Sequence, residues 1–412
     1  MRMRKLLSVG AYAAVLLAGP VLAQQPAAPE DPGPVMTRTP PPNAQLPLLM
    51  QALQGTSVGD LLNSANIRIV GWVDGGYTYS SRGSGRLSIE TLPNRFGDEF
   101  ILNQVSLMIE RPLDPKEFSW GFQLQGWAGA DAALLNPIRG ALIRHPDPRF
   151  GFDVPNAFLQ VHLPILTEGG VDVAVGEHTP FIGAEPPVPF LRNFYSNDYQ
   201  WFYGLPAVAT SVIVTAHVNP QLDVINAIST GTPTFFTMMS KSPAYMGVAN
   251  YWLEEDKKTK ISLAFAAGPF NPQSSRLSTL ECLTVTRNWN ELLTQIVQFY
   301  AGYSEATVFV PGLQRAYGLY SIFSFHLNPT LDLNTRAEWY KDVDGLSYPG
   351  GTGFKTDYEE VTLGVNYHPT KWLQLRPELR GDFANDARAF GRFNGPGDHS
   401  QFTAAIDCLI MF

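Results

Sequence analysis

The C-terminal residues 401–412 have one apolar face, and Gln401, Thr403, Ala405 and Asp407 begin the other face. Apolar residues stand at every second position from Phe402 to Phe412, and 373–382 and, apart from Thr335, 331–340 follow the same rule. A period of two places successive side chains on opposite faces of a β-strand. Alternating segments of about ten residues, separated by turns, are typical of a membrane β-barrel, although a soluble β-sandwich also alternates.

The lengths of the connections favour the barrel. From residue 66 onward the pattern predicts sixteen strands, with long connections after odd-numbered strands and tight turns after even-numbered ones, as at 217–220 and 326–329. Outer-membrane barrels have this arrangement, with the tight turns in the periplasm. An even count places both ends of the barrel on the periplasmic side. The expected strands are 67–79, 100–111, 118–129, 154–163, 171–178, 207–218, 221–230, 245–254, 259–268, 280–288, 293–303, 315–326, 331–341, 358–368, 371–382 and 400–412.

The N-terminal residues predict export. Residues 1–23 combine a basic start, an apolar run over 6–17 and small residues before Ala23, which together indicate a secretory signal. The apolar run is shorter than the roughly 20 residues that span a bilayer, so a cleaved signal is favoured over an uncleaved anchor. Residues 24–65 then form a Pro-rich periplasmic linker. Within it, 48–62 is expected to form a short amphipathic helix, in the periplasm or in the barrel mouth.

Composition supports the same fold class. Charged residues make up 16% of the chain, against about 25% in soluble domains. No second apolar run could form a spanning helix, which leaves a closed barrel as the structure able to satisfy its backbone in lipid.

The net charge is −8, or −11 without the three basic residues of the signal, which argues against a nucleic-acid partner. Cys282 and Cys408 are expected to be unpaired, since they form neither a disulfide framework nor a zinc site.

Aromatic residues gather near the ends of the expected strands. In a barrel they would form the two girdles at the membrane interfaces, whereas ordinary core packing is the alternative. These residues are Tyr77, Tyr79, Trp120, Phe122, Tyr251, Trp252, Tyr300, Tyr303, Tyr367 and Trp372.

Several strand motifs resemble those of the OmpL-like β-barrel porin family of Gram-negative-type outer membranes. The resemblance covers 66–412 and implies a barrel in the cell outer membrane with a porin role, without implying a particular solute. The motifs are Gly71-Trp72-Val73-Asp74, Asn103-Gln104, Gly151-Phe152-Asp153-Val154-Pro155, Gly169-Gly170-Val171-Asp172-Val173, Asn334-Thr335-Arg336-Ala337-Glu338-Trp339, Trp372-Leu373-Gln374-Leu375-Arg376-Pro377-Glu378-Leu379-Arg380 and the strand ending in Phe412.

A barrel of sixteen strands is wide enough to leave an aqueous channel. The inward positions of the thirteenth and fifteenth strands carry charges of both signs, which form either cross-strand pairs or the wall of a constriction. If the third long loop, 179–206, folds inward, its Glu185 and also Glu177 would face the arginines across the pore and create a transverse field. The candidate pore-lining residues are Arg336, Glu338, Arg376, Glu378, Arg380, Asp382, Glu177 and Glu185.

Motifs of common enzymes are missing from the sequence. It has no His-Glu-x-x-His, no Gly-x-Ser-x-Gly and no Gly-x-x-x-x-Gly-Lys pattern, so neither catalysis nor a cofactor or metal is expected. The leading hypothesis is a porin passing small hydrophilic solutes or ions and embedded in outer-membrane lipid. The analogy with wide porins adds the expectation of a homotrimer. Two alternatives stay open: a structural or adhesive barrel with a plugged lumen, and a lipid hydrolase on a barrel scaffold.

Overall fold

The computed structural model describes the barrel and the two short helices before it. The expected signal at 1–23 and the linker residues 24–46 lie outside the described part of the chain. The structure describes residues 47–412 except 83–93, 95, 134–146, 148, 180, 207, 233, 239–241, 271–276, 306–311, 346–354 and 391–396.

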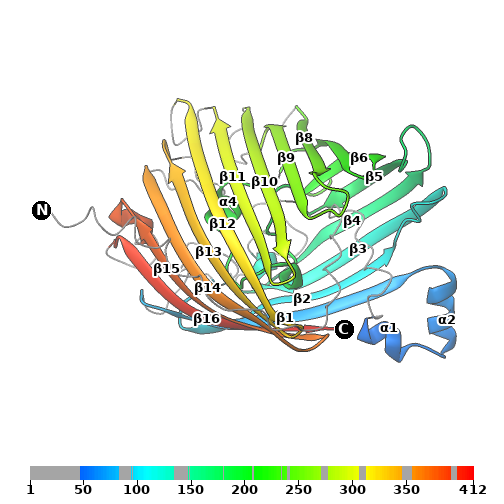
Figure 1. Ribbon diagram of the computed structural model, residues 1–412, viewed down its shortest axis with the longest axis horizontal. Helices are drawn as coiled ribbons and strands as arrows, with labels where there is room; N and C mark the ends of the chain where they lie inside the picture. Colours follow the sequence, from blue (N-terminus) through cyan, green and yellow to red (C-terminus); the bar gives the residue numbers. More distant parts are fainter. Residues whose placement is uncertain are drawn as a thin grey trace, which may run out of the picture. The chain divides into compact units, whose positions relative to one another are not determined.

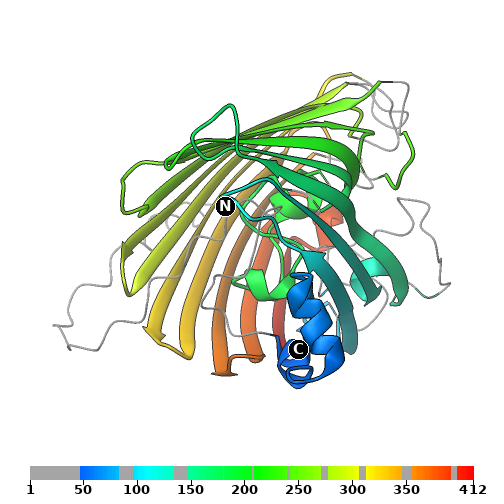
Figure 2. The same ribbon diagram turned by 90° about the vertical axis from the view of Figure 1, so that its right-hand side faces the viewer.

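Sixteen antiparallel strands form a closed barrel, in which each strand pairs with its two neighbours in sequence and β1 pairs with β16 (Figures 1 and 2). Every expected strand is confirmed, with ends that shift by at most three residues. The strands are β1 Arg68–Ser80, β2 Glu99–Arg111, β3 Ser119–Gly129, β4 Gly151–Leu163, β5 Val171–His178, β6 Ala209–Asn219, β7 Leu222–Ser229, β8 Ala244–Trp252, β9 Thr259–Gly268, β10 Ser278–Asn290, β11 Leu293–Ser304, β12 Gln314–Asn328, β13 Leu331–Asp342, β14 Thr356–Thr370, β15 Leu373–Ala384 and β16 Ser400–Met411.

The last residue of the chain completes the ring. Gly71 and Phe412 exchange two backbone hydrogen bonds of 2.7 and 2.8 Å. A Cβ atom on Gly71 would collide with the Phe412 ring, so the glycine leaves the space in which the ring lies. In Figure 1 the blue first strand and the red last strand lie side by side at this closure.

The outer face of the barrel is apolar, as the alternation predicts. Leu363 on β14 and Ile406 on β16 expose 50% and 44% of their surface, whereas their strand neighbours Thr362 and Asp407 are buried inside. Of the aromatic residues expected in the girdles, most lie outside. Trp252 and Tyr300 do not, and this corrects the prediction: both are buried, at 4% and 3% exposure, because their positions fall on the inward parity of β8 and β11.

Two short helices, α1 Leu48–Ala52 and α2 Ser57–Ser64, stand where one helix was expected. The chain turns between them at Gly55, which has a φ of +73°, and the Thr56 hydroxyl caps α2 by accepting a 3.1 Å hydrogen bond from the Gly59 amide. The helices lie beside the C-terminal end of the chain in Figure 1. No helix among the described residues is long and apolar enough to cross a bilayer.

Candidate pore constriction

The loop between β5 and β6, which we call the third loop (179–208), folds into the barrel and reaches the opposite wall. It contains the 3-10 helix η2 Pro189–Leu191 and the helix α4 Tyr199–Tyr203, and Figure 2 shows α4 inside the ring of strands. Its Tyr199 amide donates a 2.6 Å hydrogen bond to Glu338 on β13, and its Tyr195 amide donates a 2.9 Å bond to Glu378 on β15. The loop therefore crosses the lumen.

Arg336 on β13 joins the third loop to the wall. Its side chain is fully buried and bonds Glu185 of the loop at 2.8 Å and Glu360 of β14 at 2.9 Å. It also donates a 3.0 Å bond to the Ser196 carbonyl and stacks over the Phe194 ring at 4.8 Å. The sequence placed Glu185 and Arg336 on opposite sides of an open pore. They are instead in contact, because the loop extends across the whole lumen.

Arg376 on β15 holds the backbone of the loop. Its guanidinium pairs with Asp407 of β16, and one nitrogen donates to the carbonyls of Pro189 at 2.6 Å and of Arg192 and Phe194 at 3.2 Å each. A guanidinium has several donors in one plane and can serve a carboxylate and carbonyl groups at once. This buried arginine is therefore the residue that fixes the segment before α4.

Arg380 and Asp382, two residues apart on β15, hold the segment that enters α4. Arg380 bonds Asp382 at 2.9 Å and donates a 2.7 Å bond to the Asn197 carbonyl. The Tyr199 hydroxyl donates a 2.7 Å bond to Asp382, and the Arg380 guanidinium lies over the Tyr199 ring at 5.1 Å. The alternating charges predicted for β15 thus have cross-strand and loop partners rather than facing open water.

Carboxylates accept hydrogen bonds from the free backbone amides at the start of α4. Asp198 accepts a 2.7 Å bond from the Trp201 amide, the position of a helix N-cap, and Glu338 accepts bonds from the two amides between them. Burial, and then the charges of Glu338 and Glu185, raise the pKa of Asp198 well above its ordinary value. Burial also opposes ionisation of Glu185, but the charge of Arg336, the hydrogen bonds from Asp198 and the charge of Arg192 together outweigh burial, and the pKa of Glu185 is lowered.

Glycines in the strands leave recesses for side chains of the loop. A Cβ atom on Gly364 of β14 would lie 2.9 Å from the Phe194 ring, and one on Gly76 of β1 would lie 2.8 Å from the Tyr195 ring. Through these close approaches the loop packs against this wall as tightly as side chains pack in a protein interior. They require the absence of a side chain on the strand.

A side chain at position 364 is expected to displace the loop. We predict that Gly364→Val lowers stability by about 1–3 kcal/mol, the usual effect of overpacking, and changes the single-channel conductance. Gly381→Val on β15 is the matched control, because a Cβ atom there would meet only the Phe383 ring, at 3.7 Å. Thermal unfolding and bilayer recordings of both variants test this. Equal behaviour of the two would mean that the recess at Gly364 does not position the loop.

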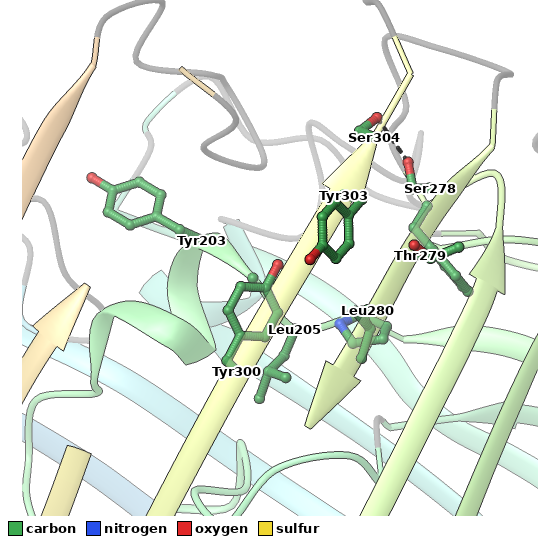
Figure 3. A pocket seen from close by; sticks show the side chains of 11 residues that line it. Tyr203, Leu205, Ser278, Thr279, Leu280, Tyr300, Tyr303 and Ser304 are labelled. Carbon is green, nitrogen blue, oxygen red and sulfur yellow. Dashed lines mark hydrogen bonds between the residues drawn. The ribbon is translucent and has the colours of Figure 1, made fainter. Parts of the chain in front are cut away.

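The loop also packs against β10 and β11, which follow β13 and β12 round the ring. A small cavity at the extracellular ends of β10 and β11 is bordered by Tyr203 and Leu205 of the loop and by Leu280 and Tyr300 of the strands (Figure 3). On this side the contacts are apolar, and the Ala184 amide adds a 2.8 Å bond to Gln298 of β11. The third loop is thus held by charged groups at β13–β15 and mainly by apolar groups at β10 and β11.

One candidate residue, Glu177, lies elsewhere. On β5 it shares the outward face with Val173 and Val175, and its carboxylate accepts a 2.6 Å bond from the Thr210 hydroxyl. It therefore does not face the arginines, which corrects the sequence prediction. The parity of β5 gives the physical reason, since residues 172, 174, 176 and 178 face the lumen and a strand alternates its faces.

The candidate residues predicted from the sequence did not include several buried residues of this site. Asp407 and Glu360 pair with arginines, and Arg192 in the loop bonds Asn197 at 2.7 Å. The parity of β16 and β14 would have found the two acids as inward charges. Arg192 has no such signal, because it lies in an irregular loop. No group of His, Cys, Asp or Glu that could hold a metal ion occurs among the described residues.

A closed barrel of sixteen strands with an apolar outer face, aromatic bands and an inward loop defines the class of outer-membrane porins. Residues 66–412 match the family model described as "Putative beta-barrel porin-2, OmpL-like". The chain therefore belongs to this porin family, as its strand motifs suggested, and is an outer-membrane protein. No curated protein sequence matches the chain.

Several solved structures have a similar fold. The outer membrane channel DcaP of Acinetobacter baumannii has a TM-score of 0.57 and 11% identity, over 84% of this chain and 97% of that one. The anion-selective porin from Comamonas acidovorans has a TM-score of 0.56 and 13% identity, over 84% and 99%. OprB of Pseudomonas putida has a TM-score of 0.56 and 12% identity, over 86% and 96%. At such identities the likeness shows the fold alone.

Proposed function

We propose that this porin passes small hydrophilic solutes or ions by diffusion, through a lumen that the third loop narrows. The supporting observation is the path of the loop, which crosses the barrel and is held at Glu338, Arg376 and Glu378 on the far wall. A barrel of this width would otherwise leave an open aqueous channel. Arg336, Arg380 and Asp382 on the wall, with Glu185 of the loop, set the constriction by positioning the loop.

Planar-bilayer recordings test this proposal. The purified porin is expected to give steady open-channel currents, and liposomes containing it are expected to swell in small sugars at rates that fall as the sugar grows. Currents that are absent from correctly folded protein would contradict the proposal.

A plugged structural barrel is the second candidate, and one observation favours it. The side chains of Arg336, Arg376 and Arg380 are at most 1% exposed, so the loop packs tightly against its wall. The same recordings separate the two functions, since a plugged barrel should give no steady current. Hydrolysis of lipid has no such support, because the family is one of porins.

We further propose that the protein assembles as a homotrimer in outer-membrane lipid. One solved structure of similar fold, OmpT of Vibrio cholerae, is described as a trimer form, with a TM-score of 0.56 and 10% identity. Closed symmetric assemblies of identical chains are the usual oligomers. For the N-terminal part, we propose a cleaved signal over 1–23 and a periplasmic linker over 24–65.

A further inference from the structure

The outer face of the barrel is not uniform around the ring. Most strands carry at least one outward-facing aromatic side chain, such as Phe152 on β4 and Tyr245 and Tyr251 on β8. The adjacent strands β5, β6 and β7 carry none. Their outward residues include Val173, Val175, Val212, Val214, Val224 and Ile228, which we call the valine face.

Aromatic side chains in a membrane barrel lie where the protein meets the lipid headgroups. β5, β6 and β7 lack outward aromatic side chains at both of their ends. This part of the wall therefore lacks the contacts with lipid headgroups that the other strands have. β5 and β7 are also the shortest strands, with 8 residues each. At a tilt of about 40° such a strand is about 20 Å high, less than the apolar band of about 25 Å that lipid requires.

The extracellular edge of the valine face carries a shelf formed by the loop after β7. The Phe236 amide donates a 2.7 Å bond to the Thr210 hydroxyl, which in turn donates to Glu177. The outward carboxylate of Glu177 is thereby buried. The same loop exposes Phe236 by 56% and Met238 by 53%, so apolar side chains project beyond the strand ends, where a protein neighbour can cover them.

We propose that the valine face, with the shelf at Phe236 and Met238, is the surface through which copies of this chain contact one another. The proposal rests on the homotrimer proposed above. Flat rows of β-branched side chains can pack closely against a second barrel, and many weak contacts add over such an area. A second copy lies at the same depth and has the same short strands, so it matches the reduced height of this part of the wall.

A bulky side chain on the valine face is expected to separate the copies. Val212→Trp on β6 and Leu363→Trp on β14 are matched, because the native residues are 47% and 50% exposed on the outer face. Light scattering of detergent-solubilised protein should give the mass of a trimer for the native chain and for Leu363→Trp, and the mass of a monomer for Val212→Trp. Heat-modifiable migration in gels shows that each variant is folded, and bilayer recordings show whether the separated barrel still conducts.

The possible outcomes test two claims separately: that the valine face is the contact between copies, and that the protein is a homotrimer. A trimeric Val212→Trp, or loss of the trimer in both variants, would overturn the valine face as the contact. A monomeric native protein in detergent and in lipid nanodiscs would overturn the homotrimer itself, while steady currents from that monomer would leave the porin function intact.

Cysteine cross-linking decides the question if Val212→Trp does not fold. In a Cys408→Ser background, Val175→Cys with Ile228→Cys places thiols on β5 and β7, and Leu319→Cys with Leu363→Cys places them on β12 and β14, again two strands apart. Cys282 is buried. A bismaleimide should link copies of the first variant into a ladder and leave the second as monomers. No ladder, or equal ladders, would contradict the proposal.

Discussion

Removal of the third loop is expected to raise the single-channel conductance several-fold, because the loop crosses a lumen that sixteen strands leave wide. In the proposed variant a short Gly-Ser linker replaces residues 182–205. The barrel should still form, since its ladder closes from strand to strand without the loop. The charges of Arg336, Glu338 and Glu378 would then face water.

The measurement is the conductance of the folded variant in planar bilayers. A Gly-Ser replacement of the turn 164–168, between β4 and β5, is the control, because it changes a connection outside the third loop. This replacement should leave the conductance unchanged. A folded barrel without the loop that conducts no better than the native protein would show that the loop does not limit the current.

Replacement of Arg376 by alanine is expected to release the segment before α4. The change removes the partner of buried Asp407 and the donor for the carbonyls of Pro189, Arg192 and Phe194. Loss of one member of a buried ion pair commonly costs about 3–5 kcal/mol. We therefore expect a lower unfolding temperature and larger, noisier currents, as the loop moves in the lumen.

Arg315→Ala is the control for Arg376→Ala. It removes the same charge, but Arg315 is 43% exposed in its pair with Asp344 at the extracellular end of β12, and an exposed ion pair adds little to stability because water screens it. Its currents and unfolding temperature should stay close to the native values. If both variants behave alike, Arg376 does not anchor the loop.

The barrel could be predicted from the sequence because each strand and each connection is encoded by neighbouring residues. Alternation with a period of two fixes which residues face lipid, and the lengths of the connections fix the sides of the membrane. Residues 401–412 and 331–340 needed no knowledge of their partners to be assigned as strands. Parity alone would also have placed Trp252, Tyr300 and Glu177 correctly. Those errors arose because these residues were assigned by their place near a strand end.

The site depended on contacts that no local pattern records. The inward fold of the third loop and the charges of β13 and β15 were proposed from the sequence, but the ion pair of Arg336 with Glu185 joins residues 151 positions apart. The bonds of Arg376 go to backbone carbonyls, which every residue has and no sequence distinguishes. The recess at Gly364 has meaning only once Phe194 lies in it.

The sequence by itself therefore determined the compartment, the strands, their closure at Phe412 and the charged inner wall, because a strand in a membrane must match its two faces to lipid and to the lumen. The tertiary structure alone decided which charges meet. An irregular loop satisfies its backbone through distant side chains, and so the pairing at Arg336 and Arg376 depends on the path of the loop through the closed barrel.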